Sequence, residues 1–206
     1  MILRAGMALA ALFALFLSTL SGAASADTHG LATIRGACEA SFLVSATFHD
    51  VSGSARCLPF EAVLARDAAG RRVIPTVEVD VPVAAMATGN KTRDGKMREM
   101  FESDRYPQIH AAAHDVDVER LRAEMGKGRD GNAAIDLLLR IHGVERKVRA
   151  AASDLKESGE RVGFVLEFPV SLREFDLKPP SVLGILRVGD EVSVKTTFSL
   201  TVPPSP

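Results

Sequence analysis

Side chains of alternating polarity run through most of this 206-residue sequence, and this period of two decides what the chain can fold into. The even positions from Val162 to Leu172 are all apolar, whereas Arg161 and Glu167 lie at odd positions among them. The same alternation recurs in rows at 42–48, 77–83, 135–141 and 192–202. A period of two places one set of side chains on a buried face and the other in water, as in an antiparallel sheet. The sequence therefore predicts an all-β fold.

Turn-forming residues divide these rows into about eight strands. Asp67 to Gly70, a Gly-rich stretch at 126–132 and the Ser158-Gly159 pair each lie between two apolar rows. Strands are expected near 39–50, 56–66, 72–83, 107–119, 133–142, 144–155, 161–173 and 190–202. Several of them have about ten residues or more, which at roughly 3.3 Å per residue is long for a sandwich and normal for a barrel.

One segment breaks the alternation and predicts a helix over residues 90–103. Asn90 is suited to cap its first turn, and Met97, Met100 and Phe101 recur at helical spacing. A single short helix beside long strands suggests a lid or plug at one end of a barrel.

The first 26 residues have the pattern of a signal peptide. Arg4 precedes an apolar run from Met7 to Leu17, and Ala24-Ser25-Ala26 fits the small-x-small rule for cleavage after Ala26. The run is short against the roughly 20 residues that span a bilayer, so no membrane span is expected. The sequence predicts a periplasmic or secreted protein whose barrel domain is formed by residues 27–206.

Export bears on the two cysteines of the chain, Cys38 and Cys57. In an oxidising compartment an even pair predicts a disulfide, which would tie the first strand to the second. The alternative, a redox or metal-binding pair, lacks the C-x-x-C spacing that lowers the pKa of a thiol.

Charge and motif content disfavour several other classes of function. The net charge of −1 gives no bulk attraction to nucleic acid. His110 and His114 would lie about 13 Å apart on a strand, too far to share one metal ion. No nucleophile elbow surrounds Ser181, and no phosphate-binding loop is present at 126–132. The sequence predicts no cofactor, no nucleic-acid partner and no enzyme activity; the weaker alternative is a metal-dependent enzyme using His49, His110, His114 or His142.

Three groups of residues in the irregular segments resemble the YceI-like family. The first runs from Val81-Pro82-Val83 through Thr88-Gly89-Asn90 and Arg93-Asp94 to Tyr106-Pro107. The second is Ile141-His142-Gly143-Val144, and the third joins Lys178-Pro179-Pro180 to Val188-Gly189-Asp190. They occur in the family's order, and the resemblance covers about residues 38–202, which is most of the mature chain.

The resemblance implies a lipocalin-like antiparallel barrel of eight strands, often homodimeric, whose apolar interior holds an isoprenoid, quinone-like or other fatty chain. The predicted function is thus non-enzymatic binding, carriage or sequestration of an apolar chain-like lipid. The main alternative is a structural or partner-binding periplasmic barrel with a filled interior.

Inward-facing apolar side chains are the candidates for the ligand pocket: Phe42, Val44, Phe48, Val79, Val81, Met97, Phe101, Ile109, Leu137, Leu139, Phe164, Leu166 and Phe168. An eight-stranded barrel is just wide enough to be filled by such residues or to enclose one small ligand, so periodicity leaves both interpretations open. Four cations on the predicted helix are candidates for a lipid head group, with a solvated helix face as the alternative: Lys91, Arg93, Lys96 and Arg98.

Overall fold

A computed structural model describes residues 30–127, 131–179, 181–182 and 186–203 of the chain. The predicted signal peptide and its cleavage site lie outside these residues. The strands are β1 Gly30–Ala46, β2 Val51–Arg56, β3 Phe60–Arg66, β4 Arg72–Pro82, β5 Gln108–Asp117, β6 Ala133–Ile141, β7 Val144–Ser158, β8 Arg161–Ser171, β9 Ser181–Val182 and β10 Leu186–Thr201. The helices are α1 Lys91–Met100 and α2 Val118–Met125, with single 3-10 turns at η1 Val83–Ala85 and η2 Arg173–Phe175. In these ranges no helix has the length and apolar character to cross a bilayer.

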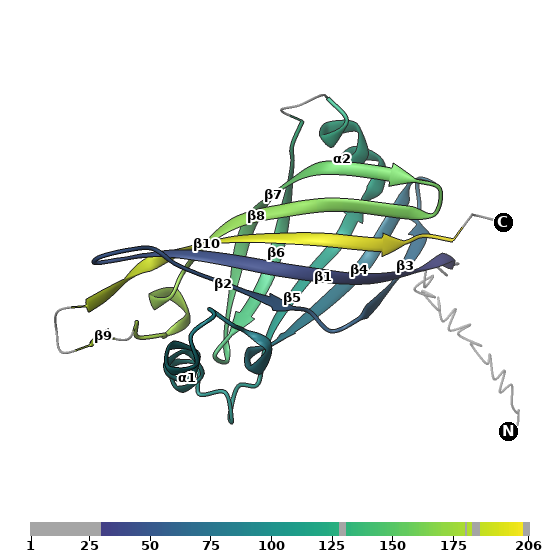
Figure 1. Cartoon of the computed structure of the whole chain (residues 1–206). Helices are drawn as coiled ribbons and strands as arrows, with labels where there is room; N and C mark the ends of the chain where they lie inside the picture. The colour runs from purple at the N-terminus through teal and green to yellow at the C-terminus, as the bar shows by residue number, and fades with distance from the viewer. Residues whose placement is uncertain (1–29, 128–130, 180, 183–185, 204–206) are drawn as a thin grey trace, which may run out of the picture.

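Eight of the strands close into an antiparallel barrel, which confirms the predicted fold. Their order around the wall is β1, β3, β4, β5, β6, β7, β8 and β10, and β10 pairs back onto β1 from Arg35↔Thr201 to Val44↔Val192. The two short strands β2 and β9 extend the edges of β1 and β10 at one end. The helices α1 and α2 lie at opposite ends of the barrel (Figure 1).

The first part of the barrel differs from the prediction in how the chain is divided. The strand expected over 56–66 is β3, which starts only at Phe60. β2 was not expected, and Cys57, Leu58 and Pro59 separate it from β3. Pro59 has no amide hydrogen to donate to a ladder, and Leu58 N–H donates instead to the carbonyl of Asp80, at 2.8 Å. β1 starts at Gly30 rather than near residue 39, and it pairs first with β3 and then with β2.

The helix expected over 90–103 is confirmed as α1, and the side chain of Asn90 accepts hydrogen bonds from the amides of Thr92 and Arg93. The second helix, α2, is not among the expected elements. The strand predicted over 107–119 overlaps its first two residues, and no element was predicted for the other six. The side chain of Asp117 caps α2 by accepting a hydrogen bond from the amide of Arg120, at 2.9 Å. The chain therefore passes from β5 directly into α2, a second helix at an end of the barrel.

A two-residue turn at His142-Gly143 contacts Tyr106, so that two of the motifs that resemble the YceI-like family lie together. Both residues have positive φ, 52° and 78°, as a tight β6–β7 hairpin requires. A Cβ added to Gly143 would lie 2.9 Å from Cε1 of Tyr106, and the Tyr106 ring packs edge-on against His142 at 4.6 Å. Tyr106 and the turn thus act as packing partners on the outside of the barrel wall.

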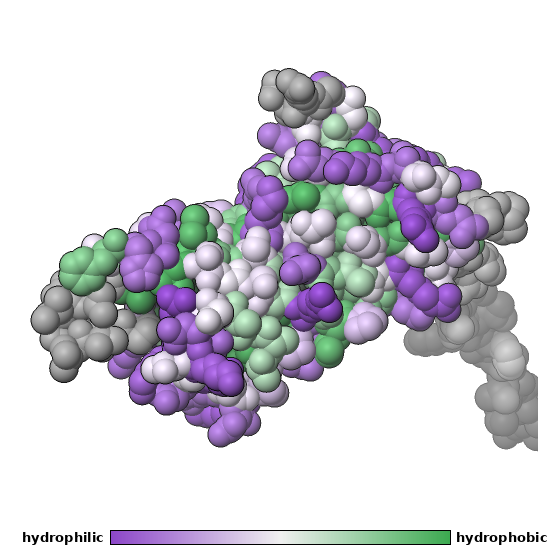
Figure 2. Space-filling model, in the orientation of Figure 1, coloured by the Kyte–Doolittle hydropathy of each residue, from purple (hydrophilic) through white to green (hydrophobic). Residues whose placement is uncertain are grey.

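The outer surface carries a mixture of polar and apolar side chains. Hydrophilic residues rim the face shown in Figure 2, whereas smaller and more apolar residues lie between them, over β10 and β1. Large apolar residues that are exposed in the described part of the chain are Leu43, Phe48, Leu58 and Val63.

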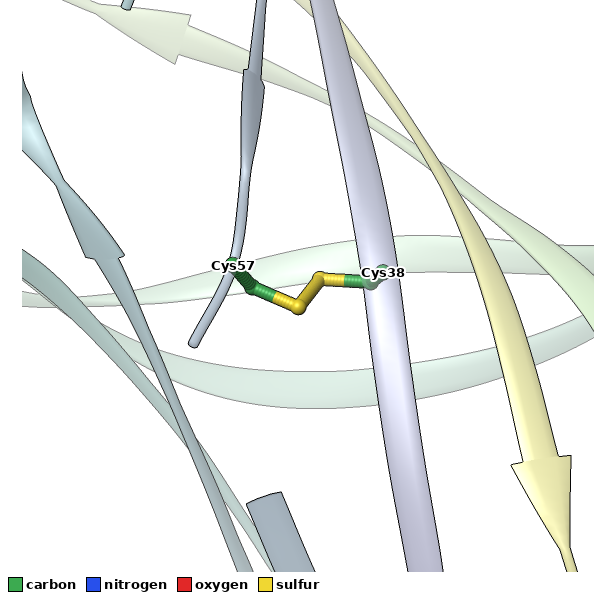
Figure 3. Close-up of a disulfide and its surroundings, with 2 residues drawn as sticks. All are labelled: Cys38 and Cys57. Atoms are coloured by element: carbon green, nitrogen blue, oxygen red, sulfur yellow. A yellow bond between two sulfur atoms is a disulfide. The ribbon is translucent and has the colours of Figure 1, made fainter. Parts of the chain in front are cut away.

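The predicted disulfide between Cys38 and Cys57 is confirmed. It joins β1 to the segment that follows β2 (Figure 3), across a Cα–Cα distance of 5.3 Å. The amide of Cys57 also donates to the carbonyl of Cys38, at 3.0 Å. The bridge therefore fixes the point at which β1 changes partner from β3 to β2.

Replacing both cysteines, Cys38→Ala with Cys57→Ala, is expected to lower the stability of the barrel by about 3 kcal/mol. The disulfide closes a loop with a sequence separation of 19, and a loop of that size restricts the unfolded chain by about this amount. For a chain of this length the change corresponds to a fall in Tm of roughly 10 °C, measurable by thermal denaturation followed by circular dichroism. An unchanged Tm, or a Tm of the double variant that still responds to dithiothreitol, would contradict this account.

Candidate ligand-binding site

The barrel encloses a cavity of about 800 Å³, and we refer to it as the lumen. This volume lies within the roughly 300–1,000 Å³ that is typical of small-molecule sites. The lumen is lined by residues from all eight barrel strands and from both helices, and the great majority of them are apolar. It extends from Met97 on α1 to Met125 on α2, along the length of the barrel.

Twelve of the thirteen candidate pocket residues lie on the wall of the lumen: Phe42, Val44, Val79, Val81, Met97, Phe101, Ile109, Leu137, Leu139, Phe164, Leu166 and Phe168. The prediction for Phe48 is wrong. β1 ends at Ala46, so Phe48 falls in the bend before β2 rather than on the inward face of a strand, and it is 71% exposed.

Small residues and glycines explain why the interior is hollow rather than filled. Consecutive alanines on β5, Ala111 to Ala113, form part of the wall. The ring of Phe60 lies over Gly36, where an added Cβ would come within 2.2 Å of its Cζ. Phe42 lies over Gly53 in the same way, also at 2.2 Å. These rings occupy space that a neighbouring side chain would otherwise fill, so they lie along the wall and leave the centre free.

Three aromatic rings meet on the wall of the lumen. Phe164 and Phe198 are stacked with centroids 4.8 Å apart, and Phe60 meets Phe198 edge-on at 6.1 Å. Sequence reasoning assigned Phe164 to the pocket but missed the other two rings. The alternation from Val192 to Val202 was recognised as a strand, and the same signal would have placed Phe198 on the inner face.

Polar groups at the α1 end of the lumen form a connected network around Thr88. Arg93 donates from Nε to the Thr88 hydroxyl at 2.8 Å and from Nη2 to the Thr88 carbonyl at 2.9 Å. The Thr88 hydroxyl and amide both donate to Asp94, and these hydrogen bonds hold the pKa of Asp94 below its usual value. The Arg93 side chain is thereby fixed at the start of α1.

Of the four candidate head-group cations, Arg93 and Lys96 lie on the lumen wall. Lys96 also forms an ion pair with Glu99, at 2.8 Å. Lys91 is exposed and Arg98 is half-buried, and neither belongs to the wall. The structure therefore brings two of the four cations to the lumen.

A second charged rim, which sequence reasoning missed, lies at the α2 end. Arg72 on β4 pairs with Glu119 on α2, and this hydrogen bond lowers the pKa of Glu119. Arg122 on α2 pairs with Glu157 on β7, at 2.7 Å. Arg72, Arg122 and Glu157 also line the lumen. Two ion pairs thus connect α2 to the strands β4 and β7.

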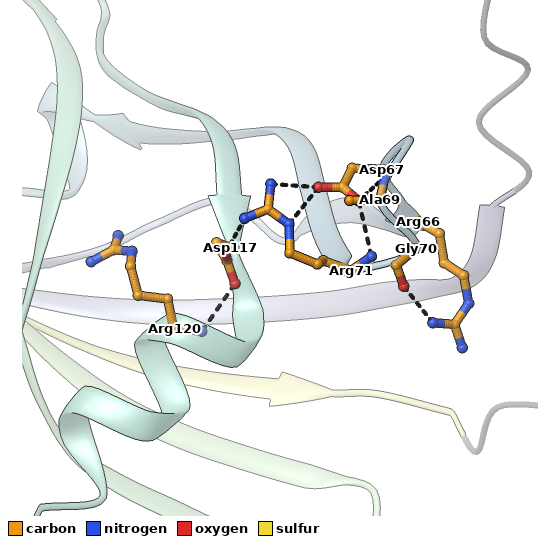
Figure 4. Close-up of polar contacts among 7 residues, drawn as sticks. All are labelled: Arg66, Asp67, Ala69, Gly70, Arg71, Asp117 and Arg120. Atoms are coloured by element: carbon orange, nitrogen blue, oxygen red, sulfur yellow. Dashed lines mark hydrogen bonds and ion pairs between the residues drawn. The ribbon is translucent and has the colours of Figure 1, made fainter.

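The start of α2 is fixed by a further polar network (Figure 4). Arg71 pairs with Asp67 at 2.7 Å and with Asp117, the residue that caps α2, at 3.3 Å. Hydrogen bonds from the backbone amide and the side chain of Arg71 lower the pKa of Asp67. The β3–β4 turn therefore positions the first turn of the helix.

The four histidines proposed for a metal-dependent enzyme lie in separate surroundings. His110 contacts Asp80 at 2.9 Å, His114 contacts Thr76 at 3.1 Å, and His142 packs against Tyr106. His49 is exposed in the bend after β1. Within the part of the chain that the structure describes, no three His, Cys, Asp or Glu residues are grouped so that they could hold a metal ion.

Comparison with known proteins gives a consistent result. The family described as the YceI-like domain matches residues 24–200. BcnA of Burkholderia cenocepacia has a similar crystal structure, with 15% identity, a TM-score of 0.58, and coverage of 79% of this chain and 95% of BcnA. A polyisoprenoid-binding domain from Saccharophagus degradans gives 15% identity and a TM-score of 0.57, with 84% of this chain and 99% of that domain covered.

The Campylobacter jejuni YceI protein gives 17% identity and a TM-score of 0.54, with coverage of 77% of this chain and 88% of that protein. Among curated proteins, none matches the chain. At these identities the similarity of the solved structures concerns the fold.

Proposed function

This chain belongs to the family of YceI-like domains, and from that premise we propose that it binds an apolar, chain-like lipid of the isoprenoid or fatty-chain type inside its barrel. The observation that carries the proposal is the hollow lumen of about 800 Å³ with its apolar wall. The similar domain from Saccharophagus degradans, which is described as polyisoprenoid-binding, supports the same class of ligand.

The driving force for binding is the removal of hydrocarbon from water. Each buried methylene contributes about 0.8 kcal/mol, so ten of them contribute roughly 8 kcal/mol. Association costs an estimated 4–15 kcal/mol of translational and rotational freedom, so a short chain would bind weakly. A long chain that follows the lumen from α1 to α2 has enough methylene groups to overcome this cost.

The protein on this proposal is a carrier or sequestrant without enzymatic activity or cofactor, acting in the periplasm or outside the cell. The Cys38–Cys57 disulfide supports an oxidising compartment. The alternative of a structural barrel with a filled interior receives no support from a hollow lumen. The homodimer implied by the resemblance stays a prediction.

The direct test is to identify what the purified protein carries. We expect native mass spectrometry to detect a bound lipid, and organic extraction to release a species with an isoprenoid or fatty chain. An empty protein would then be offered long-chain prenols and fatty acids in a displacement assay. A protein that is isolated empty and takes up neither class would overturn the proposal.

The proposed head-group contact at the α1 end gives a separate expected result. Lys96→Gln should weaken binding of palmitate about threefold at low salt and leave binding of hexadecanol unchanged. The estimate follows from the modest strength of solvent-exposed charge pairs. Lys91→Gln is the matched control, because it removes the same charge from the same helix at a position outside the lumen wall. Equal effects of the two substitutions, or no effect of either, would contradict a specific role for Lys96.

A further inference from the structure

Thr196 is the one polar residue among the buried residues that the structure describes. It lies on β10, and its side chain is 7% exposed. It occupies an inward position of the strand, between Val194 and Phe198, and it belongs to the lumen wall. A hydroxyl group therefore belongs to a wall that is mostly apolar, with the Ser41 hydroxyl on the adjacent strand also part of it.

The side chains that flank Thr196 across the sheet offer its hydroxyl no partner. Its neighbours across the sheet are Ala40 on β1 and Leu166 on β8, which have no polar side-chain atoms. No side-chain hydrogen bond joins Thr196 to another described residue, whereas the Ser41 hydroxyl, on the adjacent strand, donates to a carbonyl at 3.1 Å. The charged residues of the wall belong to its two ends, at Arg93 and Lys96 near α1 and at Arg72 and Arg122 near α2.

An unpartnered hydroxyl in an apolar interior costs free energy, and valine would fill the same space without that cost. Valine is also at least as favourable as threonine in a strand, so the strand itself gives no reason for the hydroxyl. β10 has valine at positions 188, 192 and 194 of the lumen wall. The hydroxyl at position 196 is explained if a polar group of the bound ligand forms a hydrogen bond with it.

We infer that Thr196 donates a hydrogen bond to a carbonyl oxygen of the bound lipid, so that the lumen favours a lipid with a carbonyl at the level of Thr196 over a pure hydrocarbon. The inference rests on the proposed function and adds a specificity-determining residue to it. The stacked rings of Phe164 and Phe198 lie beside this position, since Phe198 is the next inward residue on the strand. A flat carbonyl-bearing group could lie against them.

The test uses displacement of the neutral fluorescent probe N-phenyl-1-naphthylamine. The competitors are a long-chain alkane and a set of ketones of the same length, with the carbonyl at successive positions. We expect one or two carbonyl positions to bind about three- to tenfold better than the alkane, as one net hydrogen bond implies. Thr196→Val should remove this preference without weakening alkane binding, and Thr196→Ser should retain it. Thr197→Val, at the neighbouring outward position, is the matched control.

The outcomes separate the two proposals. If the alkane and all ketones displace the probe equally, or if Thr196→Val keeps the positional preference, the inference about Thr196 is wrong and lipid binding stands. If the wild-type protein binds neither the probe nor any competitor, the proposed function itself fails. Thermal denaturation of each variant establishes that the barrel is folded, and Thr196→Val is expected to keep or raise the wild-type Tm.

Discussion

Tryptophans on opposite walls of the lumen, Ala111→Trp together with Val194→Trp, are expected to abolish binding of a long-chain lipid. Ala111 is on β5 and Val194 is on β10, and three strands separate these two on each side of the barrel. Both side chains are half-buried and belong to the lumen wall, so each has open space in front of it. Two indole rings projecting from these positions would block the path of a chain.

The loss of affinity should be at least about 100-fold. Excluding four methylene groups from the lumen removes roughly 3 kcal/mol of binding free energy, which corresponds to that factor. The control is Gln108→Trp with Ser193→Trp, which adds the same two rings to outward, exposed positions of the same strands. The measurement is the dissociation constant of a fluorescent fatty acid, with thermal denaturation as the test of folding. Wild-type affinity in a folded double variant of the lumen would show that the lipid binds elsewhere.

Phe175→Ala is expected to destabilise the protein by about 3–5 kcal/mol, the largest effect of any single substitution considered. Phe175 ends the η2 turn and has no exposed surface. It packs with Val83 and Leu177, also fully buried, in the cluster that joins α1 to the end of the barrel. Truncation to alanine removes the apolar contacts and leaves a cavity that the surrounding backbone cannot fill.

Denaturant unfolding of the variant gives the change in the free energy of unfolding directly. The control is Phe48→Ala, which makes the same chemical change at a 71% exposed position in the bend after β1. This control should alter stability by less than about 0.5 kcal/mol and should leave lipid binding unchanged. A Phe175→Ala variant as stable as the control would mean that the end of the barrel tolerates a void.

The alternation of polarity was sufficient to predict the barrel strands, because burial of one face imposes it directly on the sequence. The short strand β2 was missed, because its sequence at 51–56, with Ser52, Gly53 and Ser54, has a weak strand pattern. The helix α2 was missed although Val118, Leu121 and Met125 recur at helical spacing after Asp117, a suitable N-cap. Its eight residues follow β5 without a glycine or proline, and the strand predicted over 107–119 extended into the first two of them.

The hollow lumen could not be predicted from periodicity. A wall residue such as Leu139 has the same sequence pattern whether it meets another side chain or an open space. What decides the outcome is contact between strands that are distant in sequence, as when Phe60 lies over Gly36. The charged rim at α2 has a similar origin, because Arg72 and Glu119 meet only once the barrel has closed.

The pairing of β1 with β10 joins the first described strand to the last full one, with Arg35 opposite Thr201. A portion of the chain that lacks either of these two strands therefore cannot form the complete wall. Contacts this distant in sequence make folding slow, because the ends must meet before they are stabilised. The closed interior therefore exists only after the C-terminal strand has paired with β1.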